Sequence, residues 1–114
     1  MTHARRALGA VGEERAAAWY RGQGYLVLHR NWRCREGELD LVVRRGRELV
    51  FVEVKTRTTD RFGIPAEAVT SAKQRRVRAL ARRYLADNGA RAGSLRFDVV
   101  SILAGQLEVI EAAF

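Results

Sequence analysis

The sequence predicts a single α/β domain over residues 1–114, in which helices flank a central mixed β-sheet with the element order αβββαββ. Three observations predict this fold. Runs rich in Val, Leu and Phe have the length of strands, and two longer segments have helical patterns. The second of these segments separates the third strand from the fourth, which permits a parallel crossover. A chain of 114 residues, 47% of them hydrophobic, suits one core.

The first helix is expected over about residues 4–22, because this segment is rich in alanine and is ended by glycines. The second is expected from Ser71, as its N-cap, to about Asp87, with Gly89 just beyond its end. Its apolar residues form one stripe at helical spacing: Val77, Leu80, Ala81, Tyr84 and Leu85.

The strands are expected at residues 25–33, 38–45, 48–57, 94–103 and 106–110. Gly46-Arg47 separates the second from the third, and glycine at the first central position suits a two-residue type II′ turn. Both of these strands are apolar on both faces, which favours central positions in a covered sheet.

The register of that hairpin predicts a cluster of charges. If the loop has two residues, Asp40 faces Glu53 and Glu38 faces Lys55. Because side chains alternate along a strand, all four would share one face. Adjacent carboxylates repel each other, and a hard divalent cation, Mg²⁺ or Mn²⁺, would relieve the repulsion. The alternative is a solvated Glu53–Lys55 pair of little energetic value, although the apolar run VFVEVK opposes it.

Such a site suits phosphodiester hydrolysis. The cation would polarise the phosphate and lower the pKa of a bound water. Lys55 would orient that water or stabilise charge in the transition state.

Glu13 lies on the small apolar face of the first helix, with Ala16, Ala17 and Tyr20. A carboxylate there needs a partner, which is either the shared metal or a nearby arginine.

Two further charged residues each have more than one interpretation. Lys73 lies one turn before Val77 on the buried stripe, from where it reaches a phosphate or a carboxylate, or simply snorkels to solvent. Asp98 either supports the site or pairs with Arg96.

The net charge of +8 and the pI of about 10.9 favour a polyanionic partner, nucleic acid before anionic membrane, although arginines also simply solubilise surfaces. Seven arginines form either a phosphate-tracking surface or an ordinary solvated face: Arg57, Arg61, Arg75, Arg76, Arg78, Arg82 and Arg83. The aromatics Trp19, Tyr25 and Trp32 either stack on bases or, as is more common, belong to the core.

The single cysteine, Cys34, excludes an internal disulfide framework and fits a reducing cytoplasm. No segment approaches the ~20 apolar residues of a membrane helix, and the apolar run near the N-terminus is too short for a signal peptide. We therefore expect a cytoplasmic protein with no membrane association.

Five motifs, in order, resemble the YraN-type family of predicted endonucleases: GEERAAAWYRGQGY, NWRCREGELDLV, LVFVEVKTR, FGIPAEAV and RFDVV. The resemblance covers about residues 9–103. It implies the restriction-endonuclease-like fold of the PD-(D/E)XK superfamily, similar in layout to Holliday-junction resolvases. This sequence has Leu39 where the superfamily's name places a proline.

The resemblance implies that Glu13 is the first-helix acid, Asp40 the metal aspartate, and Glu53 and Lys55 the E-x-K pair. Lys73 resembles a second-helix lysine at the edge of the site.

We therefore expect a nuclease using Mg²⁺ or Mn²⁺ at Glu13, Asp40 and Glu53, with nucleic-acid contacts from Arg57, Lys73 and Arg76. DNA, including branched or damaged structures, is expected over RNA, and a homodimer is plausible. The rival readings are a basic binding module that does not cleave and an RNA-associated or ribosome-associated protein, because no base-reading signature separates the two polymers.

Overall fold

The computed structural model describes residues 3–58 and 70–114, with side chains of the first helix described from Gly9 onward. The elements follow the expected order αβββαββ. They are α1 (His3–Gly22), β1 (Leu26–Cys34), β2 (Gly37–Arg45), β3 (Glu48–Arg57), α2 (Ser71–Asn88), β4 (Ser94–Leu103) and β5 (Gln106–Ile110). The motif FGIPAEAV and Arg61 lie outside the described residues.

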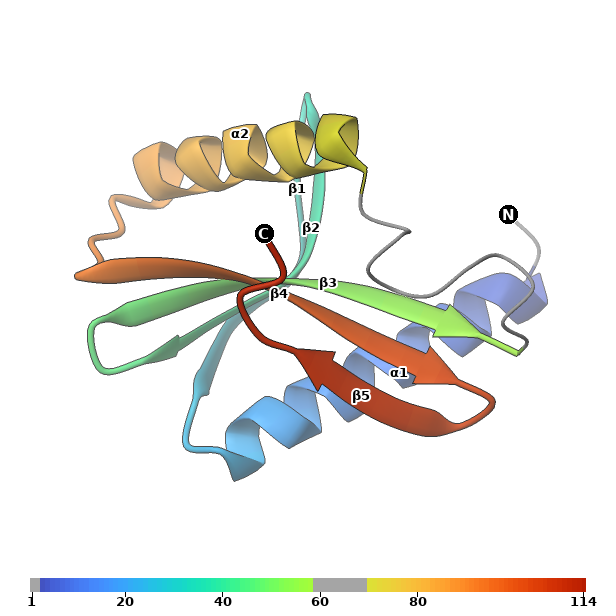
Figure 1. The fold of residues 1–114 in the computed structure, drawn as a ribbon. Coiled ribbons are helices and arrows are strands. Elements are labelled where there is room, and N and C mark those ends of the chain that lie inside the picture. The colour runs from blue at the N-terminus through green and yellow to red at the C-terminus, as the bar shows by residue number, and fades with distance from the viewer. Residues whose placement is uncertain (1–2, 59–69) are drawn as a thin grey trace.

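The five strands form one mixed sheet in the order β1-β2-β3-β4-β5. Only β3 and β4 pair in parallel, across the crossover that contains α2, and the other neighbours are antiparallel. Figure 1 shows α2 on one side of this sheet and α1 on the other. The predicted α/β class, the mixed sheet and the flanking helices are confirmed.

Each helix covers its own core cluster. On the α1 side, Ala16, Ala17 and Tyr20 have no exposed surface and pack against residues of β2, β3 and β4. On the α2 side, Val77, Leu80, Ala81 and Tyr84 pack against Phe51, Phe97 and other sheet residues. The prediction that β2 and β3 lie in the middle of a covered sheet is therefore confirmed.

The ends of α2 correct one expectation and confirm another. Thr70, not Ser71, is the N-cap, and its hydroxyl accepts a hydrogen bond from the Lys73 backbone N–H at 3.2 Å. Both hydroxyl residues are good caps, so the sequence alone placed the helix start one residue late. At the other end, Gly89 adopts φ 58° as expected of a C-terminal glycine.

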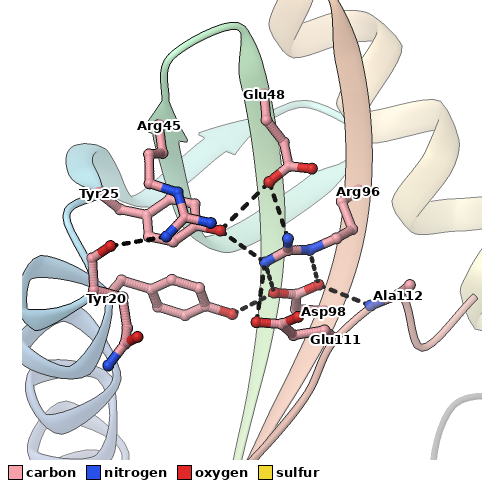
Figure 2. A network of polar contacts seen from close by, with 9 residues as sticks. Tyr20, Tyr25, Arg45, Glu48, Arg96, Asp98, Glu111 and Ala112 are labelled. Carbon is pink, nitrogen blue, oxygen red and sulfur yellow. Dashed lines mark hydrogen bonds and ion pairs between the residues drawn. The ribbon is translucent and has the colours of Figure 1, made fainter.

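A buried polar network centres on Asp98 of β4 and includes Glu48 at the start of β3 (Figure 2). Asp98 has no exposed surface and accepts hydrogen bonds from Tyr20 Oη at 2.7 Å and from Arg96 Nε at 2.8 Å. The Ala112 backbone N–H donates to the same carboxylate at 3.0 Å. Of the two readings left open for Asp98, the structure shows the pair with Arg96.

Candidate functional site

The hairpin register holds as predicted near the turn but changes at Asp40. Pairing runs from Arg45–Glu48 to Leu41–Val52 and ends there. The Asp40 carboxylate then takes the place of a backbone acceptor, because its Oδ2 receives the Val54 N–H at 2.9 Å. Asp40 therefore bridges the two strands where their ladder stops, instead of standing opposite Glu53.

Strict alternation of side chains fails at the same point. Leu39 and Val42 both pack in the cluster under α2, although they are three positions apart. One residue between them must depart from the two-residue period, which places Asp40 at an irregular position in β2. The predicted backbone pair of Asp40 with Glu53 is therefore wrong, although the charges of Asp40, Glu53 and Lys55 still act on one another.

The predicted Glu38–Lys55 pair is also wrong. Glu38 faces Arg33 across the β1–β2 pair and binds its Nε at 2.9 Å. Sequence reasoning used only the β2–β3 register, whereas β2 has a second neighbour that offers a cation.

Glu53 lies between the two lysines. Its Oε1 is 2.7 Å from Lys73 Nζ, which comes from the first turns of α2, and 3.7 Å from Lys55 Nζ. The Glu53 side chain is 14% exposed and those of Lys73 and Lys55 are 24% and 32% exposed, so the group is half-buried and open to solvent on one side. Of the readings for Lys73, contact with a site carboxylate is the one the structure shows.

These are the only lysines in the chain, because every other one of its 21 basic residues is arginine. Arginine stays charged in proteins, whereas lysine changes its pKa readily when it is buried. The rarity of lysine in an arginine-rich chain is a signal in the sequence that marks Lys55 and Lys73, and the structure places both at Glu53.

Asp40 is the most perturbed acid of this group. Burial raises the pKa of its carboxyl to about 7, with further raising by the negative charges of Glu53, Glu13 and Glu38. The Val54 N–H opposes the shift without cancelling it. A carboxyl with a pKa near neutrality beside a second acid is typical of functional sites.

The two lysines shift in opposite directions. Burial, followed by the adjacent Lys73 group, lowers the pKa of Lys55 despite the nearby carboxylates. Burial also acts to lower the pKa of Lys73, but its hydrogen bond to Glu53 and its other neighbours outweigh this effect and raise it. Lys73 is therefore the cation that neutralises Glu53, and Lys55 is the lysine that gives up a proton more readily.

Glu13 projects from α1 as a partly buried side chain, on the face that also bears the fully buried Ala16 and Tyr20. Within residues 3–58 and 70–114, neither a hydrogen bond nor an ion pair is recorded for it. Its charge acts on Asp40 by repulsion. The arginine partner considered from the sequence is therefore not found among the described residues.

The site offers carboxylate donors to a metal ion, but not a complete set of protein ligands. In the part of the chain that the structure describes, no three His, Cys, Asp or Glu side chains form a group that could hold a metal ion. Asp40 and Glu53 nevertheless fit Mg²⁺ or Mn²⁺, because such sites often use one or two carboxylates, with water and phosphate oxygens as the other ligands.

The expected arginine surface is smaller than the sequence suggested. Arg83 binds Glu36 and Asp87, and Arg78 lies over the rings of Phe97 and Phe114. Arg75, Arg76 and Arg82 are exposed on α2, and none of the described residues forms an ion pair with them.

Arg57 differs from these exposed arginines, since its Nε is buried and has no hydrogen-bond partner among the described residues, as is true of the neighbouring Thr56 Oγ1. Both residues line a pocket of about 290 Å³ between α1 and the β4–β5 turn, together with Gly12 and Ile102. Of the predicted nucleic-acid contacts, Arg76 is thus exposed and Arg57 partly buried.

The aromatic residues belong to the core, as the commoner reading had it. Tyr25 is 4% exposed, and Trp19 and Trp32 pack against the two core clusters. One contact had no signal in the sequence: His29 Nδ1 lies 2.7 Å from the hydroxyl of Tyr84.

Among the described helices, neither is long and apolar enough to cross a membrane.

Comparison with known proteins gives relatives along nearly the whole chain. The UPF0102 protein of Beutenbergia cavernae is 54% identical over 100 residues, which cover 88% of this chain and 85% of the relative. That of Mycolicibacterium vanbaalenii is 50% identical over 110 residues, with 96% and 91% covered. That of Moorella thermoacetica is 46% identical over an alignment of 121 positions that covers both chains completely. The model of "Uncharacterised protein family UPF0102" matches residues 12–102, and this chain belongs to that family.

Proposed function

We propose that this protein is a metal-dependent nuclease that hydrolyses phosphodiester bonds, in DNA before RNA, within a restriction-endonuclease-like fold. The observation that carries the proposal is the half-buried group of Asp40, Glu53, Lys55 and Lys73. It combines two acids whose charges repel each other with two lysines of opposite pKa shift. The net charge of +8 supports a polyanionic substrate.

The chain's own residues have distinct roles in this proposal. Asp40 and Glu53 would hold Mg²⁺ or Mn²⁺, which supplies a polarised phosphate and a more acidic water when bound. The Val54 N–H fixes the Asp40 carboxylate, and Lys73 fixes that of Glu53. Glu13 adds negative charge beside Asp40, which increases the attraction for a cation.

Lys55 is positioned to act on the reacting groups. Its ammonium is 3.7 Å from Glu53, too far for the tight ion pair that Lys73 makes, and a third of its side chain is exposed. Because its pKa is lowered, it can orient a water molecule, donate a proton or stabilise charge on the phosphate in the transition state.

Cleavage assays test the proposal. Purified protein would be incubated with supercoiled, single-stranded and four-way-junction DNA in the presence of Mn²⁺. We expect cleavage by the wild type, and a loss on the order of a hundredfold or more in Glu53→Ala and Lys55→Ala, since removal of one transition-state contact costs this much in other enzymes. Glu108→Gln, an exposed change on β5, is the matched control. Wild-type cleavage no greater than that of Glu53→Ala would contradict the proposal.

A non-catalytic nucleic-acid-binding module is the second candidate. It is favoured by the lack of a three-residue metal group among the described residues and by the tight Lys73–Glu53 pair, which already neutralises one acid. Titration of Mn²⁺ into wild type and Asp40→Asn by calorimetry separates the two. Heat of binding that disappears in the variant supports the nuclease, and no binding to the wild type supports the module.

A further inference from the structure

A basic pocket lies at the N-terminal end of β3, away from the group of Asp40, Glu53, Lys55 and Lys73. Arg44, Arg47 and Arg91 line an open pocket of about 410 Å³, together with Ala92 and Gly93. It is formed where the β2–β3 turn meets the loop after α2, which Figure 1 shows at the same end of the molecule. No acidic side chain is among its lining residues, and the nearby Glu48 instead binds Arg96 at 2.9 Å.

The pocket is held in shape by its own backbone contacts. The guanidinium of Arg44 donates to the Arg91 carbonyl, which joins the strand to the loop. The Arg47 carbonyl accepts from the N–H groups of Gly93 and Ser94, at 2.7 and 3.2 Å. A Cβ on Gly93 would meet Arg47 Cβ at 3.0 Å and Nε at 3.2 Å, so the absence of a side chain there lets Arg47 lie close against the loop.

The pocket opens on the same side of the sheet as the acidic group. Arg44 is two positions from Val42, which packs under α2, and Glu53 reaches Lys73 on that same helix. α2 leads from Lys73 to the loop that contains Arg91, and it leaves Arg75, Arg76 and Arg82 exposed along the way. The helix that connects the two sites therefore carries exposed arginines.

We propose that the Arg44–Arg47–Arg91 pocket binds a backbone phosphate of duplex DNA at a fixed distance from the site of cleavage. The proposal rests on the proposed function for its choice of ligand. At ~3.3 Å per strand residue, Arg47, directly before β3, and Glu53 within it are about 20 Å apart along the strand direction. With ~3.4 Å between successive base pairs, the contacted phosphate lies about six base pairs from the acidic group.

Arginine suits this role because its planar donors match phosphate oxygens. Such a contact carries no base information, so it sets the length and position of the bound duplex rather than its sequence. We therefore expect that duplexes shorter than about six base pairs bind without contacting the pocket.

Binding of hairpin DNAs with stems of about 4 and about 16 base pairs tests the proposal, measured in EDTA over a range of salt concentrations. We expect Arg47→Ala/Arg91→Ala to weaken binding to the long stem by 10- to 100-fold at about 0.1 M salt. We also expect the slope of log K against log[salt] to fall by about two, since each phosphate contact contributes about 0.9. Binding to the short stem should change far less.

Two further variants make the test specific. Arg21→Ala/Arg15→Ala removes two charges from α1, on the opposite side of the sheet, and should leave the preference for the long stem unchanged. Gly93→Ala changes no charge but displaces Arg47, and should weaken long-stem binding in the same direction. The pocket proposal is overturned if the Arg47/Arg91 variant matches the α1 variant, or if it loses affinity equally for both stems.

The same preparations in Mn²⁺ distinguish this proposal from the proposed function. DNA cleavage that is unchanged in the Arg47→Ala/Arg91→Ala variant, together with unchanged binding, would overturn the pocket proposal alone. Binding that depends on the pocket, without any cleavage in Mn²⁺, would overturn the proposed nuclease function alone.

Discussion

Both lysines of the chain lie at a single carboxylate, so each changes the proton affinity of the other. Lys73 competes with Lys55 for Glu53 and, as a neighbouring cation, helps to lower the pKa of Lys55. This arrangement gives Lys73 a positioning role that does not require contact with substrate.

The variant Lys73→Met should therefore raise the pKa of Lys55. It removes the competing cation and leaves Glu53 free to pair with the remaining ammonium. NMR titration of the lysine Cε signals measures this directly, because only two lysines are present in the protein. Arg75→Met, which removes an exposed charge from the same helix, is the control. A Lys55 pKa that stays at its wild-type value in Lys73→Met would contradict the role assigned to Lys73.

Asp40 should make the stability of the protein depend on pH. Its folded pKa of about 7 lies above the usual value, so the folded state keeps a proton that the unfolded chain has already lost. The contribution of Asp40 to the free energy of unfolding should thus be fully present below about pH 4 and be lost as pH rises through 7. Asp40→Asn cannot ionise and lacks this slope.

Urea unfolding of both proteins at about pH 5 and about pH 8 checks this expectation. Relative to Asp40→Asn, the wild type should lose about 1–3 kcal/mol over that interval, from ~1.36 kcal/mol per pKa unit reduced for partial exposure. A wild type that gains stability relative to the variant would contradict it.

At the scale of elements, the register near the turn was predictable and the acidic end of the hairpin was not. The two-residue Gly46-Arg47 turn determines the pairs from Arg45–Glu48 to Leu41–Val52 by geometry alone. Beyond them, a side chain replaces a backbone partner at Asp40, and turn chemistry contains no information about such a replacement. The sequence therefore predicted that Asp40, Glu53 and Lys55 lie near one another, but not which contacts each of them makes.

The contact of Lys73 with Glu53 was likewise only partly predictable from the sequence. The stripe of α2 places Lys73 on the side facing the sheet, which predicts its direction. The distance from Lys73 Nζ to Glu53 depends on how α2 docks, and this depends on packing against Phe51, Phe97 and their neighbours.

The contact between α1 and β3 depends on Gly12. A Cβ at this position would clash with Thr56 Oγ1 and lie 3.4 Å from Ile102 Cδ1. Gly12→Ala should destabilise the fold by about 1–3 kcal/mol, as overpacking of a core does. It should also displace the adjacent Glu13.

Gly9→Ala is the matched change in the same helix, since a Cβ there has no neighbour within 4 Å. It should stabilise the protein by about 0.5–1 kcal/mol through reduced backbone freedom of the unfolded chain. Thermal unfolding of both variants provides the comparison. Equal effects of the two substitutions would show that helix propensity, rather than close packing, accounts for the change.

At the scale of the whole molecule, the Asp98 network joins parts of the chain that are far apart in sequence. Tyr20 from α1, Arg96 from β4 and the Ala112 backbone after β5 all bind this one carboxylate (Figure 2). Arg96 further binds Glu48 at the start of β3. The network thus connects the N-terminal helix, the sheet centre and the C-terminal segment.

Asp98→Ala should cost about 3–5 kcal/mol, because it leaves the guanidinium of Arg96 buried without its main partner. Asp98→Asn keeps the shape and some of the hydrogen bonds, and should cost less. Guanidinium chloride unfolding measures both. If neither variant were less stable than the wild type, the charge of Asp98 would have no structural role.

The parallel pairing of β3 with β4 also determines the order in which the protein can assemble. Glu48 pairs with Ser94, so all of α2 must be synthesised before the central strand gains its second neighbour. Glu13, Asp40, Glu53 and Lys55 all precede α2 in the chain, and β3 is the exposed edge of the local β1–β2–β3 meander until β4 pairs with it. Non-local strand pairing is slow because the intervening chain must first close as a loop. The nascent chain therefore carries its acids and its apolar central strand uncovered for an interval during which pairing with another chain competes with folding.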